Sequence, residues 1–283
     1  MPAGENWGQR VAWRRATLAF LSAIPIGWVG ALIGLGGAEF RLPVLVGALG
    51  FPSRRAVPLN LAVSFLTLGI AFFVRGRVLP WAHLIPLWPM LGTLLLGSLS
   101  MAFWGAGWLP RVRQRHLERA ILILLAALGL LLITEAFLPL APPGGGLPTG
   151  VIRYGIAFLA GLGIGLVSSL LGVAGGELII PTLVILFGVE VKLAGSASVL
   201  IGLPTVAIGL ARHLRRGLIS SQEGLQVILP MGLGTFLGAG LAGPVLGRIA
   251  PAALKVLLGL ILLFSAWRVF HPHQVQTATS GEV

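Results

Sequence analysis

The chain has 283 residues, of which 56% are hydrophobic and only 10% are charged, and it carries 20 basic against eight acidic residues for a net charge of +12. So apolar a composition excludes a soluble globular protein. The basic residues fall mostly between apolar runs, which indicates anchoring in a membrane and argues against a nucleic-acid surface. Cysteine is absent, so disulfides, thiolate metal sites and cysteine nucleophiles are excluded as well.

Ten apolar runs follow one another along the chain. Eight of them approach the roughly 20 residues that cross a bilayer as a helix. They cover residues 17–38, 56–74, 84–105, 117–138, 151–173, 194–211, 224–246 and 252–270. The other two runs, 40–50 and 178–188, are about half as long, and each directly follows a cluster of glycines. The sequence therefore predicts an all-α polytopic membrane protein of eight long helices and two half-helices.

The two glycine clusters are copies of one motif. They read Gly34-Leu35-Gly36-Gly37-Ala38-Glu39-Phe40-Arg41-Leu42-Pro43 and Gly172-Val173-Ala174-Gly175-Gly176-Glu177-Leu178-Ile179-Ile180-Pro181. A constant offset of 138 residues relates the copies and continues beyond them, which makes each half of the chain one repeat. Each repeat is expected to hold four long transmembrane helices and a broken half-helix hairpin. The predicted divisions are a cytoplasmic N-terminal segment (1–16), a first transmembrane repeat (17–138), a Pro/Gly-rich linker (139–150), a second transmembrane repeat (151–270) and a disordered tail (271–283).

The relative orientation of the repeats depends on what each glycine break does. If residues 17–50 cross the bilayer once, the basic residues divide almost equally between the two faces. If the chain enters, breaks at the glycines and returns, one face collects Arg10, Arg14, Arg15, Arg54, Arg55, Arg111, Arg113, Arg115, Arg212, Arg215, Arg216 and Arg268. The linker, Arg75, Arg77, Arg153, Lys192 and Arg248 then lie on the other face. Because basic residues concentrate on the cytoplasmic side, the second arrangement is favoured. It makes the repeats inverted and places both termini in the cytoplasm.

The repeated motif has the composition of a solute site. Glycines and a proline break a helix inside the bilayer, and a carboxylate at that depth is costly unless it is used. Backbone N–H groups freed at the start of the next half-helix carry partial positive charge, which suits an anion. Broken helices that meet near the midplane recur in secondary transporters. The predicted substrate-binding residues are Gly36, Gly37, Ala38, Glu39, Arg41, Asn60, Gly175, Gly176, Glu177 and Ser198.

Glu39 and Glu177 have two interpretations. As a protonatable pair they would take up a proton when an anion binds or leaves, so we predict proton coupling at these residues. Alternatively, each accepts hydrogen bonds from freed backbone N–H groups, or pairs with a base such as Arg41, and merely holds its hairpin. Recurrence in both repeats is compatible with either role.

Arg41 occurs only in the first motif, and the equivalent position of the second motif is Ile179. Arg41 could give an oxyanion a fixed positive charge, or form a local ion pair with Glu39. The helices that follow add small polar residues, which either donate to a bound oxygen or allow close packing. These residues are Asn60, Ser64 and Thr67 in the first repeat and Ser196, Ser198 and Thr205 in the second. His213, which lies among arginines, is expected in a solvated cytoplasmic loop.

The motif Gly-x-Gly-Gly-Gly-x-x-x-x-Pro occurs twice, each time followed by a short apolar run and a helix rich in small residues. This pattern resembles that of the TauE/SafE sulfite exporter family, also described as the sulfonate uptake permease family. The resemblance covers about residues 17–270. It implies a bacterial or archaeal inner-membrane permease for sulfur oxyanions or small organosulfonates such as sulfite or sulfoacetate. The chain departs from the motif at Ala38 and Ala174, and its two motif glutamates occupy a position that is often apolar in relatives.

The expected function is therefore a secondary transporter that exports or imports a small sulfur-containing anion by alternating access, with proton coupling. The alternatives are a cation/proton exchanger that uses the paired glutamates and a non-transporting membrane assembly subunit. The sequence has no P-loop, nucleophile elbow or His-Glu-x-x-His motif, so no enzyme, metal or other cofactor is expected. Expected partners are a small anionic substrate, protons and the lipid bilayer, with a homodimer as the candidate assembly and no nucleic acid. The expected location is the inner (plasma) membrane, as a multi-pass protein.

Overall fold

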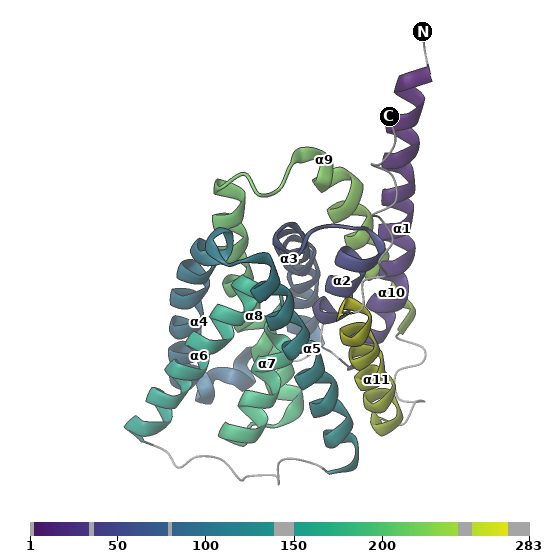
Figure 1. Ribbon diagram of the computed structural model, residues 1–283. Coiled ribbons are helices and arrows are strands. Elements are labelled where there is room, and N and C mark those ends of the chain that lie inside the picture. Colours follow the sequence, from purple (N-terminus) through teal and green to yellow (C-terminus); the bar gives the residue numbers. More distant parts are fainter. Residues whose placement is uncertain (1–2, 34–36, 79–80, 139–149, 243–250, 271–283) are drawn as a thin grey trace.

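The computed structural model describes residues 3–33, 37–78, 81–138, 150–242 and 251–270, and every regular element in these ranges is helical (Figure 1). The predicted tail and all but the last residue of the predicted linker lie outside the described residues. The first half contains α1 (Ala3–Ile33), α2 (Ala38–Pro43), η1 (Val44–Ala48), α3 (Ser53–Val78), η2 (Trp81–Leu87), α4 (Trp88–Trp108), η3 (Leu109–Arg111) and α5 (Gln114–Phe137). The second half contains α6 (Val151–Leu171), α7 (Gly176–Pro181), η4 (Thr182–Leu186), α8 (Val191–Arg215), α9 (Ser221–Glu223), η5 (Gly224–Ile228), α10 (Leu229–Ala242) and α11 (Pro251–Phe270).

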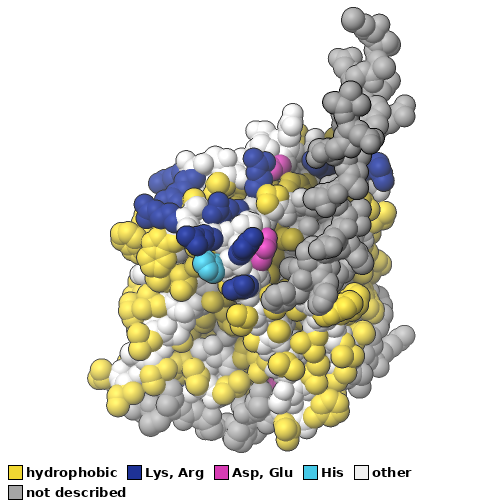
Figure 2. All heavy atoms as spheres, viewed as in Figure 1, with side chains coloured by type: hydrophobic (Ala, Val, Ile, Leu, Met, Phe, Trp, Pro, Cys, Tyr) yellow, Lys and Arg dark blue, Asp and Glu magenta, His cyan; other side chains and the backbone are white. Residues whose placement is uncertain are grey.

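Six segments within the described residues are long and apolar enough to cross a membrane. They are Ser53–Phe73, His83–Arg111, Gln114–Phe137, Val151–Leu171, Leu193–Arg215 and Ser221–Leu241. The helices α1 and α11, with 31 and 20 residues, occupy the first and last predicted apolar runs. Large hydrophobic side chains cover the flanks of the molecule (Figure 2), and Ile123, Leu159 and Leu241 are exposed by 67%, 65% and 62%. Exposure of so many large apolar side chains to water is unfavourable, whereas their contact with bilayer lipid is not. Together with the six apolar helices, this identifies a polytopic membrane protein.

The two short apolar runs form short helices, as predicted. Each consists of six residues of α-helix followed by five residues of π-helix, α2 with η1 and α7 with η4. The residues that precede them, Gly37 and Gly175, have φ angles of 73° and 84°. Only glycine adopts this left-handed backbone without steric cost, so these positions let the chain reverse abruptly into the short helix.

Two equivalent contacts show where each hairpin begins and ends. The guanidinium of Arg15 lies 5.8 Å from the ring centroid of Phe51, just after the first half-helix. The guanidinium of Arg153 lies 5.7 Å from the ring centroid of Phe187, and its Nη2 donates a hydrogen bond to the Phe187 carbonyl oxygen at 3.1 Å. Arg15 and Arg153 are separated by the same repeat offset that relates the two motifs. In both halves, therefore, the end of the short helix lies beside the residues at which the apolar run of the preceding long helix begins.

Loops rich in arginine meet at one end of the molecule, where α9 lies. Nε of Arg54, at the start of α3, donates to the carbonyl oxygen of Val112 at 3.0 Å. Nη1 of Arg216, which follows α8, donates to the carbonyl oxygen of Gly107 at 2.6 Å. Figure 2 shows Lys and Arg side chains gathered at this end. In Figure 1, α1 runs away from it and α6 runs toward it, so the two helices have opposite directions.

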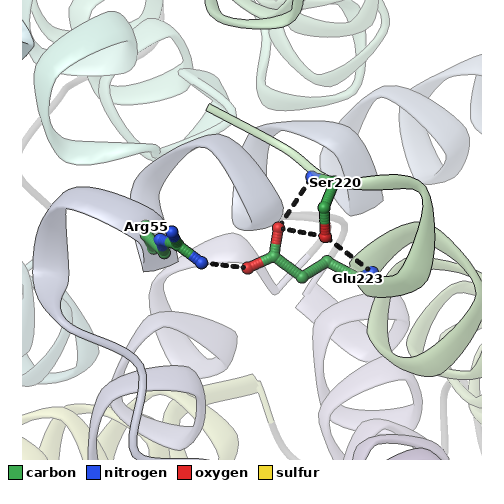
Figure 3. A network of polar contacts seen from close by, with 3 residues as sticks. All are labelled: Arg55, Ser220 and Glu223. Carbon is green, nitrogen blue, oxygen red and sulfur yellow. Dashed lines mark hydrogen bonds and ion pairs between the residues drawn. The ribbon is translucent and has the colours of Figure 1, made fainter. Parts of the chain in front are cut away.

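A polar network at the same end joins the two halves (Figure 3). Nη1 of Arg55, on α3, lies 3.2 Å from Oε1 of Glu223, on α9. The other carboxylate oxygen of Glu223 accepts from the backbone N–H of Ser220 at 2.8 Å, and the Ser220 hydroxyl caps the backbone N–H of Glu223. One glutamate therefore both caps its own helix and holds an arginine from the other half.

Helices of one half pack on helices of the other. The pairs are α4 with α6, α1 with α10, α5 with α11 and α3 with α8. At the closest crossings glycine is required for space, since a methyl group on Gly165 would overlap the carbonyl oxygen of Ser98, and one on Gly238 would overlap that of Ile24. Of the six membrane segments, those in α3 and α8 are the most buried. These two helices lie at the centre and carry the short helices on their flanks.

Candidate functional site

The carboxylates of the two motifs meet in the interior. Glu39 lies in the first turn of α2 and Glu177 in the first turn of α7, and they are only 1% and 4% exposed. The two carboxyl groups lie within hydrogen-bonding reach of each other. None of their four oxygens has a hydrogen-bond donor among the described residues, because a carboxylate that faces another carboxylate finds only acceptors.

Arg41 is fully buried near the end of α2. Its Nε donates to Oδ1 of Asn60 at 3.1 Å, its Nη2 donates to the hydroxyl of Ser64 at 2.8 Å, and its Nη1 lies 3.4 Å from the hydroxyl of Thr67. These three neutral residues are spaced as i, i+4 and i+7, so they form one face of α3. The contacts fix the guanidinium against this neighbouring helix.

Asn60 connects the two motifs. Its Nδ2 donates to the carbonyl oxygens of Ala38 at 2.7 Å and of Gly172 at 2.8 Å. Since both oxygens bind the same nitrogen, the start of α2 and the end of α6 are held together at this amide. Both donors of the side-chain amide, buried in α3, are used by the protein itself.

The guanidinium of Arg41 acts electrostatically on both glutamates. A local ion pair with Glu39 was one of the two predicted roles, but the Glu39 oxygens accept no hydrogen bond from it. The positive charge is instead oriented by α3 and faces the glutamate pair as a whole. The centre of the protein therefore contains one fixed cation and two carboxyl groups, one from each half.

The second half has no cation at the equivalent position. The residue related to Arg41 by the repeat is Ile179, which is completely buried. The hydroxyl of Ser198, the counterpart of Asn60, donates to the carbonyl oxygen of Gly195 in its own helix at 2.9 Å. Thr205, the counterpart of Thr67, shares a hydrogen bond of 2.8 Å with Ser98 of α4. The polar face of α8 therefore serves helix packing, whereas that of α3 holds the arginine.

The predicted site residues are brought together only in part. Ala38, Glu39, Arg41, Asn60 and Glu177 form one interior cluster through the contacts described above. Three glycines frame it: Gly37 and Gly175 precede the short helices, and Gly176 begins α7. Gly36 lies outside the described residues. Ser198 is buried, but its hydroxyl bonds within α8 rather than to the cluster.

Sequence reasoning named Ser64 and Thr67 as small polar residues but did not identify them as partners of Arg41, or Gly172 as a partner of Asn60. The signal was present for the first two, because their spacing from Asn60 matches one helical face, but nothing in the sequence placed that face against Arg41.

The prediction for His213 was wrong. Its side chain is 0% exposed within α8, and its Nε2 lies 3.2 Å from the carbonyl oxygen of Ser169 on α6. Among the described residues, no group of three or more His, Asp or Glu could hold a metal ion.

The fold and this cluster define a multi-pass α-helical membrane protein with a buried charged site between two short helices. The family model for the sulfite exporter TauE/SafE matches residues 3–132 and 157–282. The chain therefore belongs to the TauE/SafE sulfite exporter family, as its motifs indicated, and this family consists of membrane transporters of sulfur-containing anions rather than enzymes. Searches of curated proteins and of solved structures found no match to the chain.

Proposed function

We propose that this protein is a secondary transporter that carries a small sulfur-containing anion, such as sulfite, sulfoacetate or a related organosulfonate, across the inner (plasma) membrane by alternating access. Arg41 attracts and orients the anion, and Glu39 and Glu177 couple its movement to protons. The backbone of the two motifs, at Gly37, Ala38, Gly175 and Gly176, borders the site. One half of the protein moves relative to the other between the two end states.

The observation that supports this function best is the fixed cation at the centre of the membrane segments. A fully buried guanidinium costs several kcal/mol unless its charge is compensated, so it is retained only where it has a role. Arg41 is oriented by hydrogen bonds to the neutral side chains of Asn60 and Ser64. Its forked, planar donor arrangement matches the oxygens of a sulfonate or sulfite group.

The proposed transport cycle uses two inverted repeats. Support comes from the opposite directions of α1 and α6 in Figure 1 and from the pairing of α4 with α6 and of α1 with α10, in which each pair is the counterpart of the other. The arginine-rich end, which includes Arg54, Arg55 and Arg216, is the cytoplasmic end by the distribution of basic residues. Both termini then lie in the cytoplasm, and the linker and Arg153 lie on the opposite side.

Two other functions would use the same scaffold, and Arg41 distinguishes them from anion transport. A cation/proton exchanger would bind its cation between Glu39 and Glu177, but a fixed guanidinium that acts on both carboxyl groups repels a cation. A non-transporting assembly subunit would have no use for a buried charge cluster. The cluster therefore favours anion transport.

The test is a binding and transport screen. The purified protein is heated with sulfite, thiosulfate, sulfoacetate, taurine, sulfate or inorganic cations at two pH values, and ligands that raise the melting temperature are then assayed for uptake into proteoliposomes. We expect one class of sulfur-containing anion to stabilise the protein and to be transported. Stabilisation by cations alone, or an absence of transport for every anion that binds, would contradict the proposal.

A further inference from the structure

We propose that Glu39 and Glu177 act as a single proton-sharing pair, and that this pair together with Arg41 makes transport electroneutral, with one proton carried alongside each monovalent anion. The inference rests on the proposed function, since it concerns the same interior cluster. It also narrows the substrate class to singly charged oxyanions, such as hydrogen sulfite or an alkyl sulfonate, over doubly charged ones such as sulfate.

The geometry of the two carboxyl groups requires a shared proton. They lie within reach of a hydrogen bond, yet when both are ionised neither can donate to the other, and their four buried oxygens have no donor among the described residues. Two adjacent buried carboxylates repel strongly and do not both ionise. A single proton between them turns the contact into a strong charge-assisted hydrogen bond. The pair then carries one negative charge in total.

The surroundings leave one other charge to consider. Among the described residues, the charged groups that act on Glu39 are Glu177 and Arg41. The neighbouring helices carry buried neutral polar side chains, among them Asn60 and Ser64 on α3, Ser168 on α6, and Ser196 and Ser198 on α8. Within the described part of the chain, the net charge of the cluster is therefore set by three side chains.

The charge balance follows from these three groups. With one proton on the pair, the negative charge of the pair and the positive charge of Arg41 cancel, so the empty site is neutral. A monovalent anion bound alone would leave one uncompensated negative charge at the centre of the membrane segments, which is costly. A second proton on the pair restores neutrality. A divalent anion remains uncompensated by one charge even then, so the site selects against it.

This arrangement makes an unusual prediction for single substitutions. In Glu39→Gln one carboxyl group of the pair remains, and exchange of a single proton there is enough to balance the charge of Arg41 both with and without a bound anion. The same holds for Glu177→Gln. In the double variant no carboxyl group remains, the empty site carries one positive charge, and proton coupling is lost. Either glutamate alone is sufficient, and only removal of both uncouples protons from the anion.

The test uses the intact protein in proteoliposomes, with a trapped pH indicator for protons, a radiolabelled or conductivity-detected sulfonate, and a potential clamped by potassium and valinomycin. In the wild type we expect equal fluxes of protons and anions, and accumulation that does not respond to the membrane potential. Both single glutamine variants should keep this ratio. The double variant should lose proton flux, and a potential of about 60 mV should then change its anion accumulation ratio about tenfold, as for a singly charged step. Glu190→Gln, at an exposed glutamate outside the cluster, is the matched control.

The outcomes separate this inference from the proposed function. The shared-proton pair is overturned if anion transport by the wild type depends on the membrane potential. It is also overturned if either single variant still binds the anion by thermal shift but loses proton coupling. Both results leave anion transport itself intact. Faster transport of sulfate than of a monovalent sulfonate overturns the shared-proton pair as well. If the wild type moves no anion at all, the proposed function fails and this inference fails with it.

Discussion

Nε of Arg41 donates a hydrogen bond to Oδ1 of Asn60 at 3.1 Å, and the amide nitrogen of the same asparagine holds the carbonyl oxygens of Ala38 and Gly172. The positive charge at the centre of the protein is thus coupled to the residue that joins the two motifs. Substitutions at either position should have effects on binding and on folding that can be separated.

Replacement of Arg41 should remove anion binding more than it removes stability. Arg41→Gln retains hydrogen-bonding groups for Asn60 and Ser64 but lacks the charge, and loss of a charge partner in a buried pair costs about 3–5 kcal/mol, so affinity should fall at least about a hundredfold. Arg41→Lys keeps the charge without the forked geometry, so its affinity for the anion should lie between those of the wild type and Arg41→Gln. Binding is measured by thermal shift or titration calorimetry. Arg54→Gln, at an exposed arginine, should bind like the wild type, and an unaffected Arg41→Gln would contradict the assignment.

Replacement of Asn60 should destabilise the protein far more than replacement of its counterpart in the other repeat. Asn60→Ala leaves two buried carbonyl oxygens and one guanidinium N–H without their partner, and each orphaned group costs about 1–3 kcal/mol, so unfolding should be easier by roughly 3 kcal/mol or more. Ser198→Ala removes one bond to a carbonyl of its own helix and should cost less than about 1 kcal/mol. Denaturation in detergent micelles measures the stability of both variants. Similar losses would show that the hydrogen bonds of Asn60 to Ala38 and Gly172 contribute no additional stability.

Glycines at the helix crossings should not tolerate an added methyl group, whereas glycines elsewhere on the same helices should tolerate one. Gly165→Ala forces α6 away from α4, and such overpacking costs about 1–3 kcal/mol. A methyl group on Gly163, two residues earlier on the same helix, would have no neighbouring atom within 4 Å, so Gly163→Ala should be neutral or slightly stabilising. Gly238→Ala and Gly240→Ala form a second matched pair on α10. Melting temperatures measure the difference, and equal values within a pair would exclude the close crossing.

The proposed orientation can be tested with single cysteines, because the sequence contains none. Ser220→Cys and Val151→Cys place a thiol at exposed positions on opposite ends of the molecule. A maleimide that does not cross membranes should label Ser220→Cys only in inside-out vesicles, and Val151→Cys only in right-side-out ones. Labelling of both variants from one side would contradict inverted repeats, and exchange of the two sides would reverse the proposed orientation.

The contact between Arg55 and Glu223 should contribute little to stability by itself. The arginine side chain is 62% exposed, and exposed pairs are worth about 0–1 kcal/mol. Glu223→Gln should cost somewhat more than Arg55→Gln, since it also weakens the cap that Glu223 forms with Ser220, worth about 1 kcal/mol. A double-mutant cycle on unfolding, at low and high salt, measures the coupling. A coupling above about 2 kcal/mol would identify this contact as a principal link between the halves.

The sequence indicated the repeat, the short helices and the central position of the glutamates, because glycine, proline and a buried charge each have a local physical meaning. It did not indicate which residues hold Arg41, since Asn60, Ser64 and Thr67 mark one polar face of α3 but the sequence does not show which neighbouring element that face contacts. The error at His213 has a similar origin. The apolar run was taken to end at residue 211, but α8 continues to Arg215, and one further turn directs the imidazole toward Ser169.

The presence of the cation in one half only, with Ile179 at the equivalent position of the other, has an energetic consequence for the transport cycle. A carrier made of two identical inverted halves would open to either side of the membrane with equal free energy, because exchange of the halves converts one state into the other. Arg41 and its three partners on α3 remove that equivalence. In the proposed transport cycle, we therefore expect the empty carrier to rest preferentially open to one side, and its affinity for the anion to differ between the two faces of the membrane even without any gradient.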